Sequence, residues 1–417
     1  MIQKKVLECG TTVVMEKIPH LQSVALGIWV RAGAVDEPAE IAGVSHYIEH
    51  MMFKGTDKRT AKEIASDVDR IGGQFNAFTG KEATCYYIKT LSDNLEQAAE
   101  ILLDMLLNSK MDAAEMNKER NVIKEEIKMI QDTPDDDAHD TVCELVFSGH
   151  PLGNSVIGTF ETLDHIDRKA LTDYQRREYT RNSLVLAIAG NFDEDAICGM
   201  FEDKLTKLEA CKKAKKQAEH IYVPGYKVKE KDIEQSHISL AVPGVGLEDE
   251  AYYAMGLLSN ILGGSMSSRL FQNIREEKGL AYSVYSLASS FSNKGYFYIY
   301  AGVAHDKIRD AIFGIREELE VLKKKGVTKE ELATAKEQMK SSYIFGQENV
   351  TGRMFSIGKN MAVCGKIHTP QEVIEGFNKV TMEDMEQAAN RICSLEQYCA
   401  AAVTNEAFDI EKIMKGQ

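Results

Sequence analysis

The sequence predicts an α+β protein made of two homologous domains that arose by internal duplication. Its 417 residues are too many for one typical core and fit two domains of about 200 residues each. The two halves repeat the same order of predicted strands and helices. Strands and long helices are mixed in both halves without a strict βαβ alternation, which favours the α+β class.

The duplication is visible in matching patterns. An alternating apolar strand, followed by a glycine-containing turn with acidic residues, begins at Ser23, and the same pattern begins at Ser236. Residues 92–127 and residues 304–339 each predict a helix, a short turn and a second helix, because apolar residues recur every three or four positions. The repeat is far longer than a solenoid unit, so we expect two domains rather than an array.

The boundary between the domains is predicted from a change in composition. Residues 211–225 are rich in lysine and then continue into Pro-Gly, as is typical of a linker. Residues 1–210 then form the first domain, and residues 226–417 form the second, homologous domain.

Charge and hydropathy exclude several classes of protein. The formal net charge of −14 argues against a nucleic-acid binder, which usually carries a basic patch. No apolar run approaches the roughly 20 residues that a transmembrane helix needs. The first residues predict two short strands around a Cys-Gly turn rather than a signal or transit segment. We therefore expect a cytoplasmic protein without a membrane or nucleic-acid partner.

A predicted helix over residues 40–53 carries two histidines and a glutamate within five positions. His46 and His50 are four residues apart, so they lie on one helix face and could bind one metal ion. Glu49 lies on the flank of that face, within reach of a metal-bound water. Such a pattern also arises by chance, so a third ligand is required. In the second half the corresponding positions are all apolar: Leu258, Ile261 and Leu262.

Glu119 and Glu126 supply candidates for the third ligand. They are seven residues apart, which is two helical turns, and they share one face with Val122 and Ile123. Glutamates beside an apolar stripe are costly to bury unless they are paired or bind a metal. A salt-bridged amphipathic helix is the alternative interpretation.

Two histidines, one carboxylate and an open position form the ligand set of a catalytic zinc site. Zinc there lowers the pKa of water and polarises a carbonyl, while a nearby glutamate transfers protons. A structural zinc site would have four protein ligands, whereas only three are visible in the sequence.

The HxxEH motif at residues 46–50, followed in the same half by ERNVIKEEI, resembles the inverzincins, the insulinase, pitrilysin and mitochondrial processing peptidase family. The resemblance covers essentially the whole chain and indicates the short two-domain bacterial type. It implies one zinc ion per chain, held by His46, His50 and Glu126. It also implies that Glu49 is the base and that Glu119 steers a histidine. Glu125 is the alternative third ligand, although it points about 100° away around the helix.

The same resemblance assigns a substrate-binding segment. Residues 72–90 are similar to the edge strand of the family's active site. They alternate as a strand does, and Asn76 and Ala77 could pair with an extended substrate by strand addition. Residues 150–163 also match a family segment, which we interpret as a structural loop near the site.

In the second half, residues 268–286 match another family segment, and Arg275 and Tyr282 are the implied functional residues. A guanidinium and a phenol can donate hydrogen bonds to an oxyanion and to substrate carbonyls. Without the resemblance, they would be interpreted as a surface arginine and a half-buried strand tyrosine. The resemblance also implies that each domain is a mainly antiparallel sheet packed with helices, of the LuxS/processing-peptidase-like type. The first domain would be catalytic, and the second would bind no metal but complete the substrate site.

The implied function is that of a zinc-dependent endopeptidase that cleaves peptides or unfolded segments in an enclosed chamber, with zinc-bound water activated by Glu49. A homodimer is expected, with a heterodimer as the alternative. The competing hypothesis is a non-catalytic peptide-binding scaffold, or a subunit of a heterodimeric peptidase. The intact ligand set argues against that hypothesis.

Overall fold

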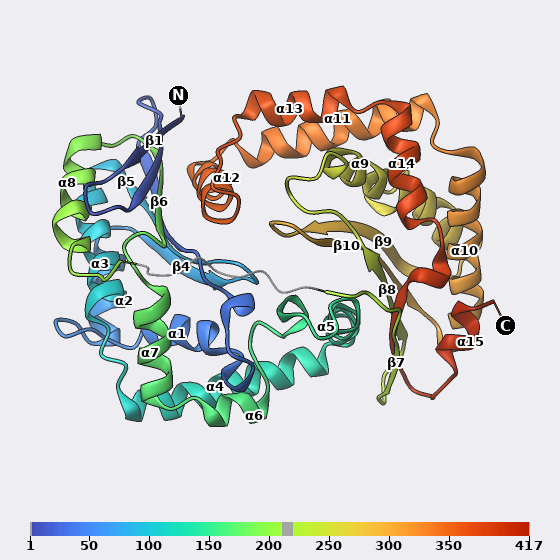
Figure 1. Ribbon diagram of the computed structural model, residues 1–417, viewed down its shortest axis with the longest axis horizontal. Coiled ribbons are helices and arrows are strands. Elements are labelled where there is room, and N and C mark those ends of the chain that lie inside the picture. Colours follow the sequence, from blue (N-terminus) through green and yellow to red (C-terminus); the bar gives the residue numbers. More distant parts are fainter. Residues whose placement is uncertain (1, 211–219, 417) are drawn as a thin grey trace. The chain divides into compact units, whose positions relative to one another are not determined.

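The computed structural model describes residues 2–210 and 220–416, and it contains two separate, mainly antiparallel sheets (Figure 1). The first sheet has the strand order β1-β2-β6-β3-β5-β4, and only the β2–β6 pair in it is parallel. Its strands are β1 (Ile2–Val6), β2 (Thr12–Lys17), β3 (Ser23–Val30), β4 (Gln74–Thr79), β5 (Thr84–Leu91) and β6 (Leu184–Gly190). The predicted mixture of helices with antiparallel sheets is confirmed.

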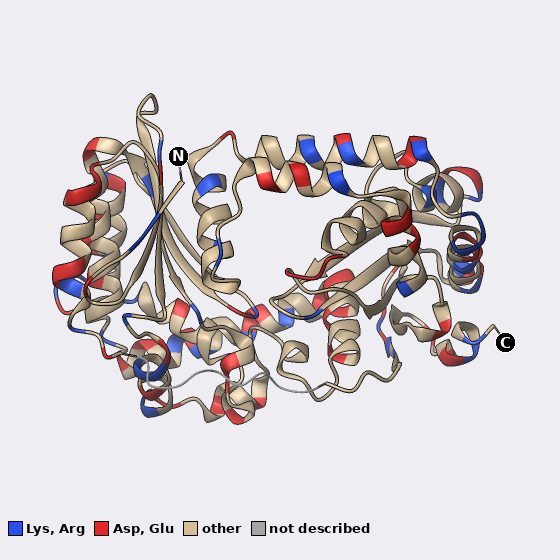
Figure 2. Cartoon of the chain, turned by 45° about the horizontal axis from the view of Figure 1, so that its top comes forward, with Lys and Arg blue, Asp and Glu red and all other residues tan. Residues whose placement is uncertain are grey.

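Helices cover one face of this first sheet and enclose its larger core. The central strands β3 and β6 carry no charged residue and are almost completely buried, as strands covered on both faces require. The helices that contribute to this core are α1 (Val44–Met52), α2 (Ala61–Arg70), α3 (Leu95–Asn108), α4 (Ala113–Asp132), α6 (Phe160–His165), α7 (Arg168–Glu178) and α8 (Glu194–Leu205). Figure 2 shows the complementary pattern, with acidic and basic residues concentrated on helices and loops.

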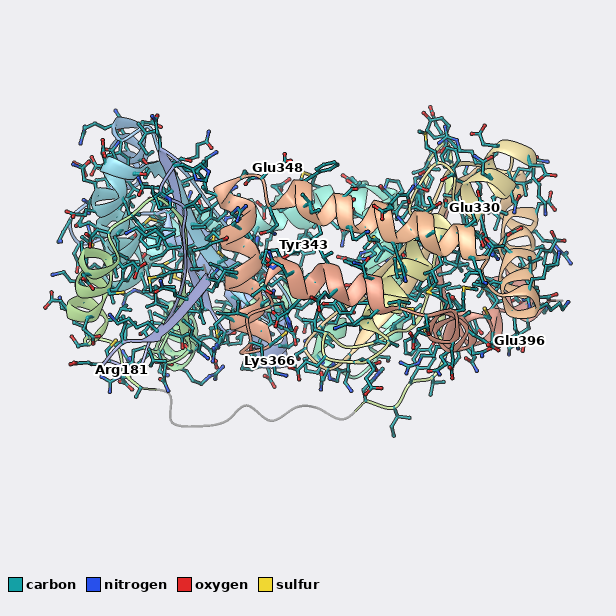
Figure 3. The ribbon with its side chains drawn as sticks, turned by 90° about the horizontal axis from the view of Figure 1, so that it is seen from above. Arg181, Glu330, Tyr343, Glu348, Lys366 and Glu396 are labelled. Carbon is teal, nitrogen blue, oxygen red and sulfur yellow. The ribbon has the colours of Figure 1, made fainter. Side chains whose placement is uncertain are left out.

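The opposite face of the first sheet is covered by a helix from the second half of the chain. This helix, α12 (Val350–Val363), packs on β2, β3 and β6 through Met354, Ile357 and Met361. Figure 3 labels Glu348 and Lys366, which lie just before and just after it. An ion pair of 2.6 Å between Arg353 and Glu16 also ties α12 to β2.

The second sheet has the order β7-β11-β8-β10-β9, with β7 and β11 parallel. Its strands are β7 (Tyr226–Glu230), β8 (Ser236–Pro243), β9 (Ala281–Ser290), β10 (Gly295–Val303) and β11 (Cys399–Thr404). The helices that follow or cover it are α9 (Tyr252–Gly263), α10 (Ile308–Lys325), α11 (Lys329–Gly346), α13 (Pro370–Lys379), α14 (Met382–Ile392) and α15 (Ile410–Met414). The order β3-α1…β4-β5-α3-α4 in the first half thus returns as β8-α9…β9-β10-α10-α11, as the duplication predicts.

Helix α5 (Pro134–Val146) is the counterpart of α12, because it comes from the first half and packs on β8 and β11 of the second sheet. Its buried Asp137 pairs with Lys229 of β7 and with Lys231, at 2.6 and 2.7 Å. Each half of the chain therefore contributes one helix that packs on the sheet of the other half.

This exchange changes the division of the chain. Compact packing groups residues 2–127, 154–210 and 345–369 into a first unit, and residues 128–153, 220–344 and 370–416 into a second. The boundaries predicted at 210 and 226 separate the two copies of the duplicated sequence. Packing divides the chain differently, because α5 belongs to the second unit and α12 belongs to the first. Most of the predicted linker 211–225 lies outside the described residues.

Two local features differ from the sequence interpretation. The segment 72–90 forms not one strand but the hairpin β4–β5, because Gly80 donates its backbone N–H to Ala83 and closes a turn. The segment 150–163 contains a short 3-10 helix at Pro151–Gly153 and continues as a loop up to Thr159, after which α6 begins at Phe160. Within the described residues, no helix combines the length and the apolar character that crossing a bilayer requires.

Candidate metal centre

Helix α1 places the two predicted histidine ligands side by side. The ring centroids of His46 and His50 are 4.6 Å apart, as expected for side chains one turn apart on one face. The opposite side of the helix anchors it in the core through five buried apolar residues: Val44, Tyr47, Ile48, Met51 and Met52.

Helix α4 brings the third candidate ligand to the histidines. Glu126 Oε2 lies 3.4 Å from His50 Nε2 and 3.8 Å from His46 Nε2. Among the described residues, this is the one group of three potential metal-binding side chains whose ligand atoms all lie within 4.8 Å of one another. Nitrogen and oxygen ligands of a tetrahedral zinc ion are separated by about 3.4 Å, given bond lengths near 2.1 Å. The donor set therefore fits zinc.

The other acidic residues of α4 are distinguished by the phase of the helix. Met116, Ile123 and Ile127 are buried, and this fixes which side of α4 faces the core. Glu119 lies on the α1 side and is also buried, whereas Glu125 is exposed. Glu125, the alternative third ligand, is thus not part of the cluster.

Glu119 connects to the cluster through His50. Its Oε2 lies 3.1 Å from His50 Nδ1, and its Oε1 lies 2.7 Å from Lys54 Nζ. This contact fixes the ring so that Nε2 faces Glu126. Lys54 balances the charge of the buried carboxylate. Sequence reasoning missed Lys54, although its place four residues after His50 was a usable signal.

Burial keeps His46 in the form that binds metals. Burial, followed by the neighbouring His50, lowers the pKa of His46 to about 3, so the imidazole is neutral at physiological pH. Its Nδ1 is buried and has no hydrogen-bond partner among the described residues. His46 is therefore held by its helix and by packing, whereas His50 is held by a partner on its ring.

Glu49 lies beside the cluster in an environment suited to proton transfer. Burial raises the pKa of its carboxyl, while a hydrogen bond from the Thr79 hydroxyl and the nearby His50 lower it. A carboxyl with a raised pKa can accept a proton and return it near neutral pH. Thr79, the last residue of β4, was not identified from the sequence.

Strand β4 offers a free edge next to α1. It is the last strand of the first sheet, it pairs only with β5 within the ranges that the structure describes, and it also contacts α1. Asn76 is exposed, and its side chain accepts a 2.8 Å hydrogen bond from the backbone N–H of Ala77. An edge strand presents unpaired backbone groups to which another extended chain can bind.

The two residues predicted in the second half lie together within the second unit. Arg275 belongs to the π-helical segment η5 (Phe271–Glu277), and its guanidinium carbon lies 5.3 Å from the ring centre of Tyr282. Tyr282 is on the edge strand β9 and is 73% exposed. Their predicted action on a substrate stays a prediction.

Comparison with known proteins identifies the family. Residues 12–160 match the family model Insulinase (Peptidase family M16), and residues 165–339 match Peptidase M16 inactive domain. The chain is 40% identical over 408 residues to the protein named Uncharacterized zinc protease YmxG of Bacillus subtilis, covering 97% of this chain and 98% of that protein. The chain belongs to the M16 (insulinase) family. An Uncharacterized zinc protease of Rickettsia felis is 38% identical over 389 residues, covering 93% and 94% of the two M16 chains.

Solved structures confirm the M16 fold. The crystal structure of a protease from Helicobacter pylori matches with a TM-score of 0.89 at 20% identity, covering 97% of this chain and 99% of that chain. A peptidase M16 inactive domain from Pseudomonas fluorescens matches with a TM-score of 0.88 at 20% identity, covering 98% of both chains. The resemblance inferred from HxxEH is thus confirmed at the level of family and fold. Among the described residues, the cluster of His46, His50 and Glu126 lies in the part of the chain that matches the Insulinase model.

Proposed function

We propose that the chain is a zinc-dependent endopeptidase that hydrolyses extended peptides at the metal cluster of its first unit. The observation that carries this proposal is the convergence of His46, His50 and Glu126 within 4.8 Å, with Glu49 beside them. The name zinc protease, given to its M16 relatives, supports it.

Each residue of the cluster has a defined task in this proposal. His46, His50 and Glu126 hold the ion, and Glu119 orients His50. When bound, zinc supplies a Lewis acid that polarises the scissile carbonyl and makes water more acidic. Glu49 accepts a proton from the attacking water and returns it to the leaving amine. The hydroxyl of Thr79 keeps the Glu49 carboxyl in place through its hydrogen bond.

The substrate binds as an added strand on β4. The free edge of β4 can pair only with an extended backbone, so peptides and unfolded segments are the expected substrates. Asn76 and Ala77 supply backbone and amide groups for this pairing. Arg275 and Tyr282 are proposed to donate hydrogen bonds to substrate carbonyls. The enclosed chamber, the dimer and the cytoplasmic location stay predictions.

The test is the substitution Glu49→Gln, measured on a quenched fluorescent peptide together with metal analysis. Zinc stoichiometry should stay the same, and hydrolysis should fall roughly 10²–10⁴-fold, since a general acid–base group is lost. Glu40→Gln is the control, because Glu40 is exposed just before α1 and carries the same charge. Full activity in Glu49→Gln contradicts the mechanism. Wild-type protein that shows no chelator-sensitive cleavage would instead support the scaffold hypothesis.

A further inference from the structure

The first turn of α1 is held by a carboxylate from outside the helix. The residue before the helix, Gly43, has φ of 94° and no side chain to cap the helix. Instead, Glu37 Oε2 accepts a 2.6 Å hydrogen bond from the Gly43 N–H, and Glu37 Oε1 accepts one of 2.8 Å from the Ser45 N–H. Both oxygens of one side chain are thus used on two of the backbone donors that a helix start leaves unpaired.

Glu37 is buried to an extent that is unusual for a glutamate. It is 7% exposed, and burial raises the pKa of its carboxyl to about 7 although both hydrogen bonds lower it. Burying a carboxylate is costly unless hydrogen bonds compensate for the lost water. The negative charge also interacts favourably with the partial positive charge at a helix N-terminus.

The position of this cap matters because of the residue that follows it. Ser45 directly precedes His46, and the Ser45 hydroxyl also lies 2.8 Å from the hydroxyl of Tyr174 on α7. Within the described part of the chain, His46 Nδ1 has no hydrogen-bond partner, so no side chain there fixes its ring as Glu119 fixes that of His50. The place of His46 therefore depends on the backbone of the first turn of α1.

We propose that Glu37 is a positioning residue of the metal cluster: by holding the N–H groups of Gly43 and Ser45, it places His46 for metal binding. This inference rests on the proposed zinc site. Two buried glutamates then divide the task, since Glu119 acts on the ring of His50 and Glu37 acts on the backbone before His46.

The chain contains a matched control for the loss of such a carboxylate. Glu202 of α8 also accepts two backbone hydrogen bonds, from the N–H groups of Glu8 and Cys9 at 2.7 and 2.6 Å. It holds the turn between β1 and β2, and β1 lies at the opposite edge of the sheet from β4. Losing Glu202 removes the same type of contact from the same unit without affecting α1.

The experiment compares the zinc affinity of the wild type, Glu37→Gln, Glu37→Ala and Glu202→Ala, measured by competition with a chromophoric chelator. Glu37→Ala should weaken zinc binding roughly 10- to 100-fold, the range for losing an outer partner of a ligand. Glu37→Gln should lose less zinc affinity than Glu37→Ala, because the amide of glutamine keeps one acceptor oxygen. Glu202→Ala should bind zinc like the wild type. The unfolding midpoints of the metal-free proteins show how much stability each variant has lost.

Two outcomes overturn the inference: zinc affinity that is unchanged in both Glu37 variants, or affinity that falls equally in Glu202→Ala. If Glu37→Ala does not fold, Glu37→Gln decides the question alone, because it preserves the size of the side chain. Wild-type protein that binds no zinc would instead refute the proposed metal site. The two failures can therefore be distinguished.

Discussion

Glu125 and Glu126 are neighbours in the sequence, yet only Glu126 lies at the histidines. The difference comes from the phase of α4, because burial of Ile123 and Ile127 turns one side of the helix towards the core. Glu126 falls on the side that faces α1, and Glu125 is exposed. At the scale of single residues, apolar packing therefore decides which of two chemically identical candidates is the proposed metal ligand.

This selection can be measured with two single substitutions. Glu126→Gln should weaken zinc binding by more than the roughly 10- to 100-fold that losing an outer partner produces, since an amide is a poor replacement for a carboxylate ligand. Glu125→Gln makes the same chemical change one residue away and should alter the affinity less than about threefold. Competition with a chelator measures both. If Glu125→Gln weakens zinc binding more than Glu126→Gln does, then Glu125 rather than Glu126 is the third ligand.

Burial of Glu37 predicts a pH dependence of stability. Its pKa is about 7 in the folded chain against 4.5 as the ordinary value, so the folded state binds the proton more tightly than the unfolded state. The stability from this group is complete below pH 4.5 and is lost as the pH rises towards 7. The titratable groups that interact electrostatically with the Glu37 carboxyl are Asp36, Tyr174 and Tyr179. Burial raises the pKa of both tyrosines.

The measurement compares the free energy of unfolding of the metal-free wild type with that of Glu37→Gln. The wild type should lose on the order of 2 kcal/mol relative to the variant between pH 5 and pH 8. His46 has the opposite effect, because its lowered pKa makes the fold less stable as the pH falls below 6.5. Both proteins contain His46, so subtracting their free energies of unfolding removes this contribution. A difference that stays constant over this range would show that Glu37 does not titrate there.

At the scale of elements, α12 packs closely on the first sheet at Gly358. An added Cβ at Gly358 would lie 2.7 Å from Trp29 Cε2 and 2.8 Å from the Cβ of Ala187. Glycine therefore allows a helix from the second half to approach β3 and β6 closely. The contact closes the smaller core of the first unit.

Gly358→Ala should destabilise the protein by about 1–3 kcal/mol, because the added methyl group must displace buried side chains. Gly199→Ala in α8 is the matched control, because nothing lies within 4 Å of its added Cβ. That variant should gain about 0.5–1 kcal/mol from the better helix propensity of alanine. Denaturant unfolding of both variants tests this pair. Equal effects would mean that α12 can move away from the sheet.

The elements also show how far the sequence could predict the site. The spacing of His46 and His50, and that of Glu119 and Glu126, defines helix faces directly, because a helix repeats every 3.6 residues. Thr79 was missed, since a contact from a strand end depends on tertiary placement, whereas Lys54 could have been found from its place four residues after His50. The alternation of residues 72–90 indicated extended structure but could not locate the turn at Gly80. The face on which α5 or α12 packs was equally unpredictable, because an amphipathic pattern does not identify its partner.

At the scale of the whole molecule, duplication and exchange have different consequences. Duplication produced two sheets with corresponding orders of strands, and among the described residues the candidate metal cluster lies only in the first unit. Exchange of α5 and α12 makes each unit depend on both halves of the chain. The second half thus supplies a helix that covers the sheet of the half with the candidate ligands.

This dependence predicts the behaviour of the separated halves. A fragment of residues 1–210 lacks α12, so the apolar face formed by Val14, Trp29 and Val185 would be exposed to water. Its own α5 would also lack the sheet on which it packs. We expect this fragment to aggregate or to bind zinc far more weakly than the whole chain.

Co-expression with residues 220–417 should restore a soluble pair that co-purifies and binds one zinc ion, because each fragment supplies a helix to the other. Size-exclusion chromatography with metal analysis measures both results. A fragment 1–210 that folds alone and binds zinc as tightly as the whole chain would show that the exchanged helix is dispensable for the metal site.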